Sequence, residues 1–193
     1  MNHYFTENPA LLTDERTLTL DIFDMHFKFL ANNGLFSCDK VDEASITLLK
    51  NIPPLTGTLL DLGCGYGTLG IVLAKKYNLT LTMADINRIA LDYAVKNAKL
   101  NHVAVTPIHS NSFANIAESF DNIVLNPPIH AGKEVMYNMY KESAAHLNPG
   151  GALYIVIQKK HGAESTIKKL AEIFTRVEVL YKKKGCFVVK SNM

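Results

Sequence analysis

The stretch that most constrains the fold lies between residues 58 and 70 and reads TLLDLGCGYGTLG. An apolar run carries one carboxylate, Asp61, near its end, and three glycines then alternate at Gly63, Gly65 and Gly67 before an apolar helical pattern begins. Strand, glycine turn and helix form the βα unit that brings backbone N–H groups and a helix N-terminus up to a ligand. Glycine permits positive φ and removes the side chains that would keep a ligand from the backbone. The stretch therefore predicts an α/β fold with a ligand at this turn.

Two classes of ligand fit this turn. Gly65, Gly67 and Gly70 match the GxGxxG dinucleotide fingerprint, which on its own is a weak signal. Asp61, two residues before the first glycine, instead suits a ligand that bears an ammonium group and no pyrophosphate. The stretch resembles motif I of the class I S-adenosylmethionine-dependent methyltransferases, whose cofactor has no phosphate. A structural βα turn that binds nothing is the remaining alternative.

The length and composition predict one globular domain. A chain of 193 residues, 48% apolar and 20% charged, buries enough surface to fold without disulfides or metal. The three cysteines, Cys38, Cys64 and Cys186, are far apart and form no CxxC pair, so neither a zinc site nor a disulfide framework is predicted. No stretch reaches ~20 consecutive apolar residues, and the N-terminus does not resemble a signal peptide. We expect a cytoplasmic monomer that binds neither metal nor membrane.

Hydrophobic periodicity predicts a regular alternation of strands and helices. Residues 17–30 alternate strictly, with apolar residues from 18 to 22 on one face and from 25 to 29 on another, which indicates an N-terminal hairpin turning near Phe23-Asp24. Strands alternating with helices imply a parallel sheet covered on both faces, in a single domain with residues 1–36 as an appendage and 37–193 as the catalytic core. The pattern predicts helices at 36–50 (with Asp39 as cap), 87–100, 134–147 and 163–174, buried strands at 79–84, 103–108, 120–125 and 152–157, a turn at 148–151, and a closing hairpin of 177–181 and 186–189.

Polar residues follow four of the predicted strands at the point where each strand ends. Because the carboxyl ends of parallel strands meet at one edge of a sheet, we expect these residues to form one ligand site. Asp85, 22 residues beyond Gly63, is placed to accept the two ribose hydroxyls of an adenosine ligand. Its structural alternative is to cap the helix that begins near Asn87. The strand-end residues are Asp61, Gly63, Asp85, Asn111, Ser112 and Asn126.

The run Asn126-Pro127-Pro128-Ile129 distinguishes between the two cofactor interpretations. Two consecutive prolines fix the backbone and leave carbonyls without local N–H partners, and the asparagine adds an amide oxygen. These acceptors suit a flat –NH2 group, whose hydrogens they can hold while the nitrogen lone pair points elsewhere. A rigid strand-end turn is the structural alternative. In this position the run resembles motif IV of the amino methyltransferases, which act on exocyclic base amines or amide nitrogens.

A longer resemblance covers the chain from about residue 4 onward. Leu35-Phe36-Ser37 with Asp39 and Asp42, the glycine stretch and residues 126–132 together resemble the ribosomal small-subunit guanine-N2 methyltransferase C family. The resemblance implies a Rossmann-like class I methyltransferase fold, a mostly parallel seven-stranded sheet with helices on both faces, here with an N-terminal β-hairpin extension. Better-known members carry a second, degenerate N-terminal methyltransferase domain, and this chain looks most like the short single-domain relatives. Ile129 stands where many relatives place an aromatic residue that stacks on the target base.

The same resemblance implies a role for each matching residue. S-adenosylmethionine is the implied cofactor, with its methionine part at the glycine turn, its ribose at Asp85 and its adenine near Asn111 and Ser112. The amide of Asn126 and the carbonyl of Pro127 would hold the target amine, and His130 is not required as a base. The implied cofactor-binding residues are Asp61, Gly63, Cys64, Gly65, Gly67, Asp85, Ile86, Asn111, Ser112 and Asn126. The implied catalytic residues are Asn126, Pro127, Pro128 and Ile129, and the implied RNA-binding residues are Asp42, His130, Lys133, Lys159 and Lys160.

The charge distribution favours RNA as the substrate. Residues 159–193 hold nine of the twenty Lys and Arg against three Glu, although the whole chain carries only +2. Such a local excess is typical of a nucleic-acid footprint, and a solvated helix face with a lysine-protected edge strand is its structural alternative. We therefore expect methylation of rRNA, free or in a ribosomal subunit, at guanine N2. The alternatives are a protein glutamine amide or small-molecule amine as substrate, a nicotinamide-dependent oxidoreductase, and a non-catalytic RNA-binding domain.

Overall fold

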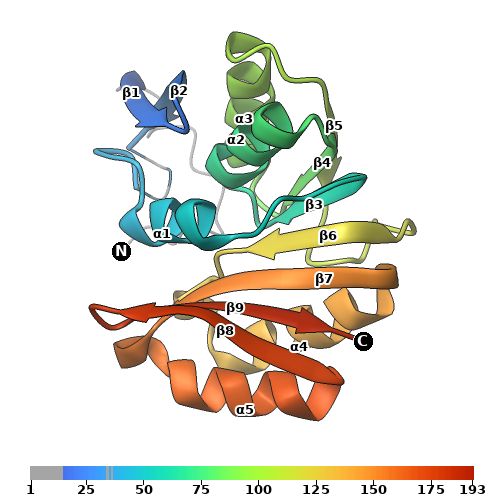
Figure 1. The fold of residues 1–193 in the computed structure, drawn as a ribbon. Helices are drawn as coiled ribbons and strands as arrows, with labels where there is room; N and C mark the ends of the chain where they lie inside the picture. Colours follow the sequence, from blue (N-terminus) through green and yellow to red (C-terminus); the bar gives the residue numbers. More distant parts are fainter. Residues whose placement is uncertain (1–14, 34, 36) are drawn as a thin grey trace.

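The structure, a computed structural model, describes residues 15–33, 35 and 37–193. Its main strands are β3 (Thr58–Leu62), β4 (Thr80–Asp85), β5 (Val105–His109), β6 (Phe120–Leu125), β7 (Leu147–Gln158), β8 (Arg176–Lys183) and β9 (Cys186–Asn192). Across these residues they form a seven-stranded sheet of order β5-β4-β3-β6-β7-β9-β8 (Figure 1). Strands β3 to β7 are parallel, β9 runs antiparallel to β7, and β8 antiparallel to β9. The predicted mostly parallel sheet and the closing hairpin are confirmed.

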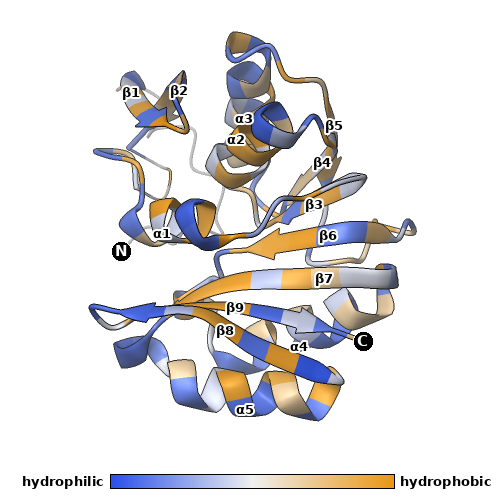
Figure 2. Ribbon diagram, viewed as in Figure 1, coloured by the Kyte–Doolittle hydropathy of each residue, from blue (hydrophilic) through white to orange (hydrophobic). Residues whose placement is uncertain are grey.

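Helices cover both faces of the sheet because neighbouring residues of each strand point to opposite faces. Leu59 joins a core beneath α1 (Glu43–Asn51), α2 (Thr68–Tyr77) and α3 (Arg88–Leu100). Leu60 joins a second core, beneath α4 (Lys133–Ala145) and α5 (Ala163–Ile173). Figure 2 shows apolar residues along the central strands β6 and β7, which are buried on both faces as parallel strands usually are.

The predicted N-terminal hairpin is present as β1 (Glu15–Ile22) and β2 (Met25–Asn32), joined at residues 23 and 24. Both turn residues have positive φ, 56° and 59°, which is typical of the two-residue turns that match strand twist. Leu18 lies opposite Phe29 and Leu20 opposite Phe27, and all four side chains are buried. The apolar residues of the two strands therefore share one face. The prediction that they occupy different faces was wrong, because antiparallel pairing brings directly opposed residues to the same side.

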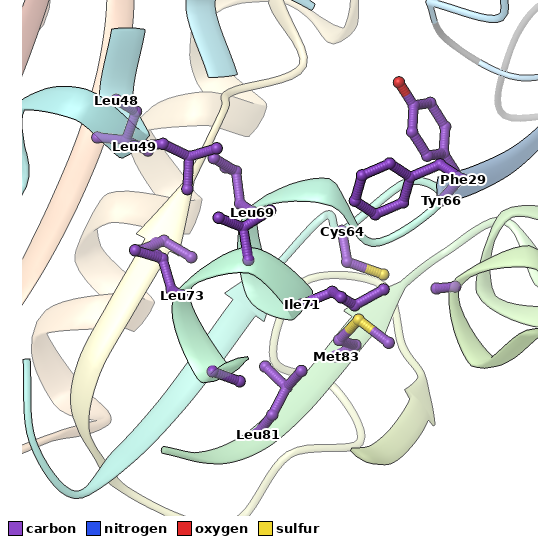
Figure 3. Close-up of a cluster of buried hydrophobic side chains, with 14 of the residues drawn as sticks. Phe29, Leu48, Leu49, Cys64, Tyr66, Leu69, Ile71, Leu73, Leu81 and Met83 are labelled. Atoms are coloured by element: carbon purple, nitrogen blue, oxygen red, sulfur yellow. The ribbon is translucent and has the colours of Figure 1, made fainter. Parts of the chain in front are cut away.

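Asn97 of α3 and Asn101, the residue that caps the end of this helix, hold the hairpin to the core. Asn97 accepts from the Leu30 N–H (2.7 Å) and donates to the Leu30 carbonyl (2.9 Å) and to the Tyr66 carbonyl (2.9 Å). Asn101 makes the same pair of bonds with the backbone of Lys28. The two amides thus act as a neighbouring strand for β2. Figure 3 shows Phe29 beside Tyr66 in the same buried cluster as α2, so the hairpin packs directly behind the glycine turn.

The first helix begins later than the sequence predicted. α1 starts at Glu43, and its N-cap is Asp42, whose Oδ2 accepts from the Ser45 N–H at 2.8 Å. Residues 37–42 are not helical, and the remaining predicted residue, Phe36, lies outside the described part of the chain. Asp39, the predicted cap, instead pairs with Arg16 of β1. Either aspartate suits a helix start, and the hairpin's arginine engages the earlier one.

The predicted turn at residues 148–151 lies inside β7. Leu147 of β7 pairs with Phe120 of β6, and the next pair is Ala152 with Asn122. Four residues of β7 therefore lie between the two pairs, against one residue of β6. The segment is therefore an irregular bulge rather than a strand boundary. Its glycine at position 150 has a φ of 81°, which explains the turn-like composition. The other predicted helices and strands are present, with boundaries that differ by a few residues.

Candidate active site

A pocket of about 260 Å³ opens at the carboxyl ends of the parallel strands. Its walls come from the ends of β3 to β7, the residues that follow them, and the start of α1. The pocket brings together most of the residues that the sequence singled out. The predicted site residues on its wall are Asp42, Asp61, Gly63, Cys64, Gly65, Asp85, Ile86, Asn111, Ser112, Asn126, Pro127, Pro128, Ile129 and His130.

Four predicted residues do not line the pocket. Gly67 lies behind the turn, with a φ of 94°, and an added Cβ would sit 2.8 Å from Ile71 Cδ1. A glycine is needed at this position because of its backbone conformation and the close packing around it, and not because of a ligand. Lys133, Lys159 and Lys160 are exposed residues at the start of α4 and after β7, outside the wall itself.

Gln158, the last residue of β7, also lies on the pocket wall, at the sheet edge where the strand topology places it. The pocket further contains residues that the sequence analysis missed. Ser45 lies three residues after Asp42, which is the spacing between a helix N-cap and the N–H group that it accepts from. Once the cap is known, this spacing predicts that Ser45 lies beside it. His161 and Met139 also lie on the wall, and no sequence pattern marks them.

The glycine turn is held by β4 and opens its backbone to the pocket. The N–H groups of Gly63 and Cys64 both donate to the Ala84 carbonyl, at 2.8 and 3.0 Å. Gly63 and Gly65 have φ values of 66° and 56°, a region that favours glycine. Cys64 is 8% exposed, and burial, followed by the charges of two nearby aspartates, raises the pKa of its thiol. Cys64 therefore serves as a small packed residue, since a nucleophile needs an accessible thiolate.

Two buried carboxylates flank the glycine turn. Asp61 is 1% exposed, and its Oδ2 accepts from the Gly70 N–H at 2.7 Å. Asp85 is 3% exposed, and its two oxygens accept from the Gly65 and Asn87 N–H groups, both at 2.8 Å. Burial raises the pKa of Asp61 to about 7, with the Gly70 bond acting against it and the charge of Asp85 adding to it. A cation in the pocket would relieve this cost.

The charge state of Asp61 leads to a pH prediction. Below pH 7 the carboxyl is protonated, so a ligand that carries an ammonium group loses its counter-charge there. We expect the affinity for S-adenosylmethionine to fall by up to about tenfold for each pH unit below 7 and to level off above it. Isothermal titration calorimetry between pH 5.5 and 8 measures this dependence. Asp61→Asn is the control, and a wild-type curve as flat as the variant's would contradict the prediction.

The Asn126 end of the pocket is built from β6 and α1. The amide nitrogen of Asn126 donates to Asp42 Oδ2 at 2.9 Å and to Ser45 Oγ at 3.2 Å. The Pro128 carbonyl accepts from the Ala131 N–H at 3.0 Å, so the expectation that this carbonyl lacks a local N–H partner was wrong. Asp42, predicted to contact RNA, thus caps α1 and holds Asn126 on the pocket wall.

On the adenine side that the sequence predicted, Ser112 donates to a carboxylate oxygen of Glu142 on α4. Ser112 has a φ of 52°, so the loop after β5 is tightly turned here. Asn111 is exposed beside it on the pocket wall, and His109 contacts the Ile86 carbonyl at 2.8 Å. The loops after β4 and β5 therefore form one continuous wall.

Basic groups gather at the rim. His130 and His161 lie on the wall, and burial, then the charges of Lys160 and His130, lower the pKa of His161. The Lys159 N–H donates to the Gly185 carbonyl at 2.7 Å, which joins the segment after β7 to the β8–β9 turn. Three further exposed lysines, at positions 182, 183 and 184, lie at the end of β8 and in that turn.

Three further findings concern the described ranges. The three cysteines there are free. No group of three or more His, Cys, Asp or Glu among those residues could hold a metal ion. No helix in that part of the chain has the length and apolar character needed to cross a membrane.

A comparison with protein families gives the site its context. The model of the methyltransferase small domain matches residues 26–190. The chain belongs to this family. It is a class I S-adenosylmethionine-dependent methyltransferase, and the predicted enzyme class and cofactor are confirmed. The nicotinamide alternative, which the GxGxxG match had left open, is set aside.

Individual relatives agree with this assignment. The chain is 39% identical to the Bacillus subtilis protein YbxB, described as uncharacterized, over 98% of both chains. It is 39% identical to the ribosomal RNA small subunit methyltransferase C of Photorhabdus laumondii, over 64% of this chain and 38% of that one. A 16S rRNA N2 methyltransferase from T. thermophilus, solved in complex with AdoMet and guanosine, has a TM-score of 0.81 at 26% identity and is covered over 51% of its length. The chain thus spans about half or less of these two rRNA methyltransferases.

Proposed function

We propose that this chain transfers a methyl group to an exocyclic base amine of RNA, specifically guanine N2 in small-subunit rRNA. The observation that carries the proposal is the Asn126 amide, held by its nitrogen at one end of a pocket whose other end bears two buried carboxylates. The rRNA methyltransferases among the relatives support RNA as the substrate. The alternative substrates, a glutamine amide or a small-molecule amine, would use the same acceptors.

The residues present fit S-adenosylmethionine. Asp61 is buried, and no described Lys, Arg or His pairs with it, so an ammonium or sulfonium cation is its natural partner. Asp85 lies on the pocket wall, and a carboxylate that holds the glycine turn through Gly65 is also of the chemical type that accepts from ribose hydroxyls. When bound, the cofactor supplies an electrophilic methyl group on its sulfonium sulfur.

The chain's own contribution is to position the amine. The Asn126 Oδ1 and the Pro127 carbonyl would accept the two amine hydrogens, which directs the nitrogen lone pair toward the methyl group. Orientation of this kind can supply ~7–11 kcal/mol in favourable cases. As positive charge develops on the nitrogen both hydrogen bonds strengthen, so they stabilise the transition state more than the ground state. The methylated amine then releases its proton to solvent, without a dedicated base.

The lysines at the rim support RNA over a small amine. We use the name rim lysines for Lys159, Lys160 and the three lysines at positions 182, 183 and 184. No described acidic side chain forms an ion pair with any of them. The hydrogen bond from the Lys159 N–H to the Gly185 carbonyl keeps the two groups of lysines together beside the pocket. A phosphate backbone that crosses this rim would bring a splayed base to the pocket.

The direct test is methylation of defined substrates with radiolabelled S-adenosylmethionine. Unmodified small-subunit rRNA and assembled subunits are incubated with the protein, and the nucleosides are separated by mass spectrometry. The expected product is N2-methylguanosine. Labelling of another base refutes the guanine assignment, labelling of ribosomal protein favours the glutamine alternative, and no transfer to either favours a non-catalytic RNA-binding domain.

The rim lysines give a second prediction. The logarithm of the association constant for RNA is expected to fall by roughly 0.7 for each tenfold rise in salt concentration and each phosphate neutralised. Lys159→Ala with Lys160→Ala should flatten this slope and leave the affinity for S-adenosylmethionine unchanged. The matched control replaces Lys96 and Lys99, two exposed lysines of α3, by alanine. An equal change of slope in both double variants would show that the rim has no special part in RNA binding.

A further inference from the structure

The side-chain amide of Asn126 is held asymmetrically. Its nitrogen donates to Asp42 Oδ2 and to Ser45 Oγ, at 2.9 and 3.2 Å. Across residues 15–33, 35 and 37–193, no group donates to the oxygen of the same amide. One end of the amide is therefore engaged by α1, and the other is available to a ligand.

The Asp42 carboxylate decides which end of the amide is which. An ionised carboxylate only accepts hydrogen bonds, so it selects the –NH2 end of Asn126. If the amide were rotated by half a turn, its oxygen would face the carboxylate oxygen, and two acceptors would repel. A bond to a charged group is also roughly twice as strong as a neutral one. The orientation of Asn126 therefore follows from the acceptor oxygen that Asp42 presents to it.

Asp42 is itself fixed by the helix that it caps. The same Oδ2 accepts from the Ser45 N–H at 2.8 Å and from the Ser45 hydroxyl at 3.0 Å. Ser45 is buried, at 6% exposed, and the Asp42 side chain is half-buried on the pocket wall. The cap and Asn126 are 84 residues apart in the sequence, and the contact joins α1 to the end of β6.

We propose that Asp42 is a positioning residue that orients the Asn126 amide toward the target amine. It keeps the Asn126 oxygen on the substrate side. The hydrogen bond from the –NH2 group to the carboxylate also polarises the amide, which makes the oxygen a stronger acceptor. A rotated amide would present its own hydrogens to the amine and could not hold it. This inference rests on the proposed methylation of an amine at the same site, and it gives Asp42 a role beside its predicted contact with RNA.

Two substitutions separate positioning from helix capping. Asp42→Ser keeps a preferred N-cap oxygen for Ser45 but removes the carboxylate from Asn126. Asp42→Asn keeps a cap and an acceptor oxygen in the place of Oδ2. We expect Asp42→Ser to lower the single-turnover rate about ten- to hundredfold, the range for losing one hydrogen bond to a charged group. Asp42→Asn should recover most of that loss, and both variants should keep the wild-type affinity for S-adenosylmethionine and a similar melting temperature.

A double-mutant cycle tests whether Asp42 acts through Asn126. In the background of Asn126→Ala, the change Asp42→Ser should cause no further loss of rate, since the group that it orients is absent. An equal loss in both backgrounds would assign Asp42 a purely structural role and overturn the proposal. A wild-type rate for Asp42→Ser would overturn it as well.

A measurement without RNA keeps this inference separate from the proposed function. The side-chain –NH2 signals of Asn126 in a 15N-correlated NMR spectrum can be assigned by their loss in Asn126→Ala. They should move markedly in Asp42→Ser and little in Asp42→Asn. Unmoved signals in Asp42→Ser would overturn the contact, whatever the activity. A wild-type protein that methylates no RNA would refute the proposed function, while the NMR signals would still decide whether Asp42 orients the amide.

Discussion

Asn126→Ala is expected to lower the single-turnover rate of methyl transfer by about 10²- to 10³-fold. The Asn126 oxygen is placed to accept from the amine nitrogen, and that bond strengthens as the nitrogen becomes positive. Removing one such preorganised group from a water-excluded site costs ~2.7–4 kcal/mol by analogy with an oxyanion-hole donor. The measurement is rapid mixing of excess enzyme with radiolabelled S-adenosylmethionine and RNA, which separates chemistry from product release.

The affinity for the cofactor should barely change in this variant. The glycine turn and Asp85 lie after β3 and β4, whereas Asn126 follows β6, so the methionine and ribose ends keep their contacts. Asn111→Ala is a matched control, because it removes another pocket amide on the predicted adenine side. We expect that control to weaken cofactor binding and to leave the rate at saturation close to wild type. Near-normal turnover in Asn126→Ala would reduce the Asn-Pro-Pro run to a rigid strand-end turn.

Local patterns were sufficient to predict the sheet and the position of the pocket. The glycine turn can be predicted because its positions with positive φ, such as Gly63 and Gly65, are glycines in the sequence. The strand-end residues are readable because parallel strands fix the edge at which they meet. Asp61, Asp85 and Asn126 were therefore predicted to line one site, although they are far apart in the chain, and the structure places all three in the lining of one pocket.

Contacts between distant elements were out of reach of such patterns. Asp39 and Asp42 are equally good helix caps by residue type, and the choice depends on Arg16 of the hairpin and on Asn126 of β6. The hairpin is held by Asn97, whose amide replaces a neighbouring strand, and an asparagine within a helix gives no sign of this. Tertiary hydrogen bonds set these features, and no periodicity in the sequence records them.

Asp85→Ala is expected to weaken the binding of S-adenosylmethionine by about 10²- to 10⁴-fold. Two bonds from a carboxylate to ribose hydroxyls are worth ~1.5–3 kcal/mol each, and each 1.4 kcal/mol is a factor of ten in affinity. The substitution also removes the acceptor for the Gly65 and Asn87 N–H groups, so the glycine turn loses part of its support. Calorimetry with S-adenosylhomocysteine measures the total loss.

The ribose contribution can be isolated from this loss of support with a cofactor that lacks one hydroxyl. The 2′-deoxy analogue of S-adenosylhomocysteine should bind wild type more weakly than the parent compound. In Asp85→Ala the two compounds should bind almost equally, because the acceptor for the missing hydroxyl is gone. If the variant instead discriminates between them as wild type does, Asp85 acts only on the turn, as the acceptor for the Gly65 and Asn87 N–H groups. The buried carboxylate would then shape the pocket without touching the sugar.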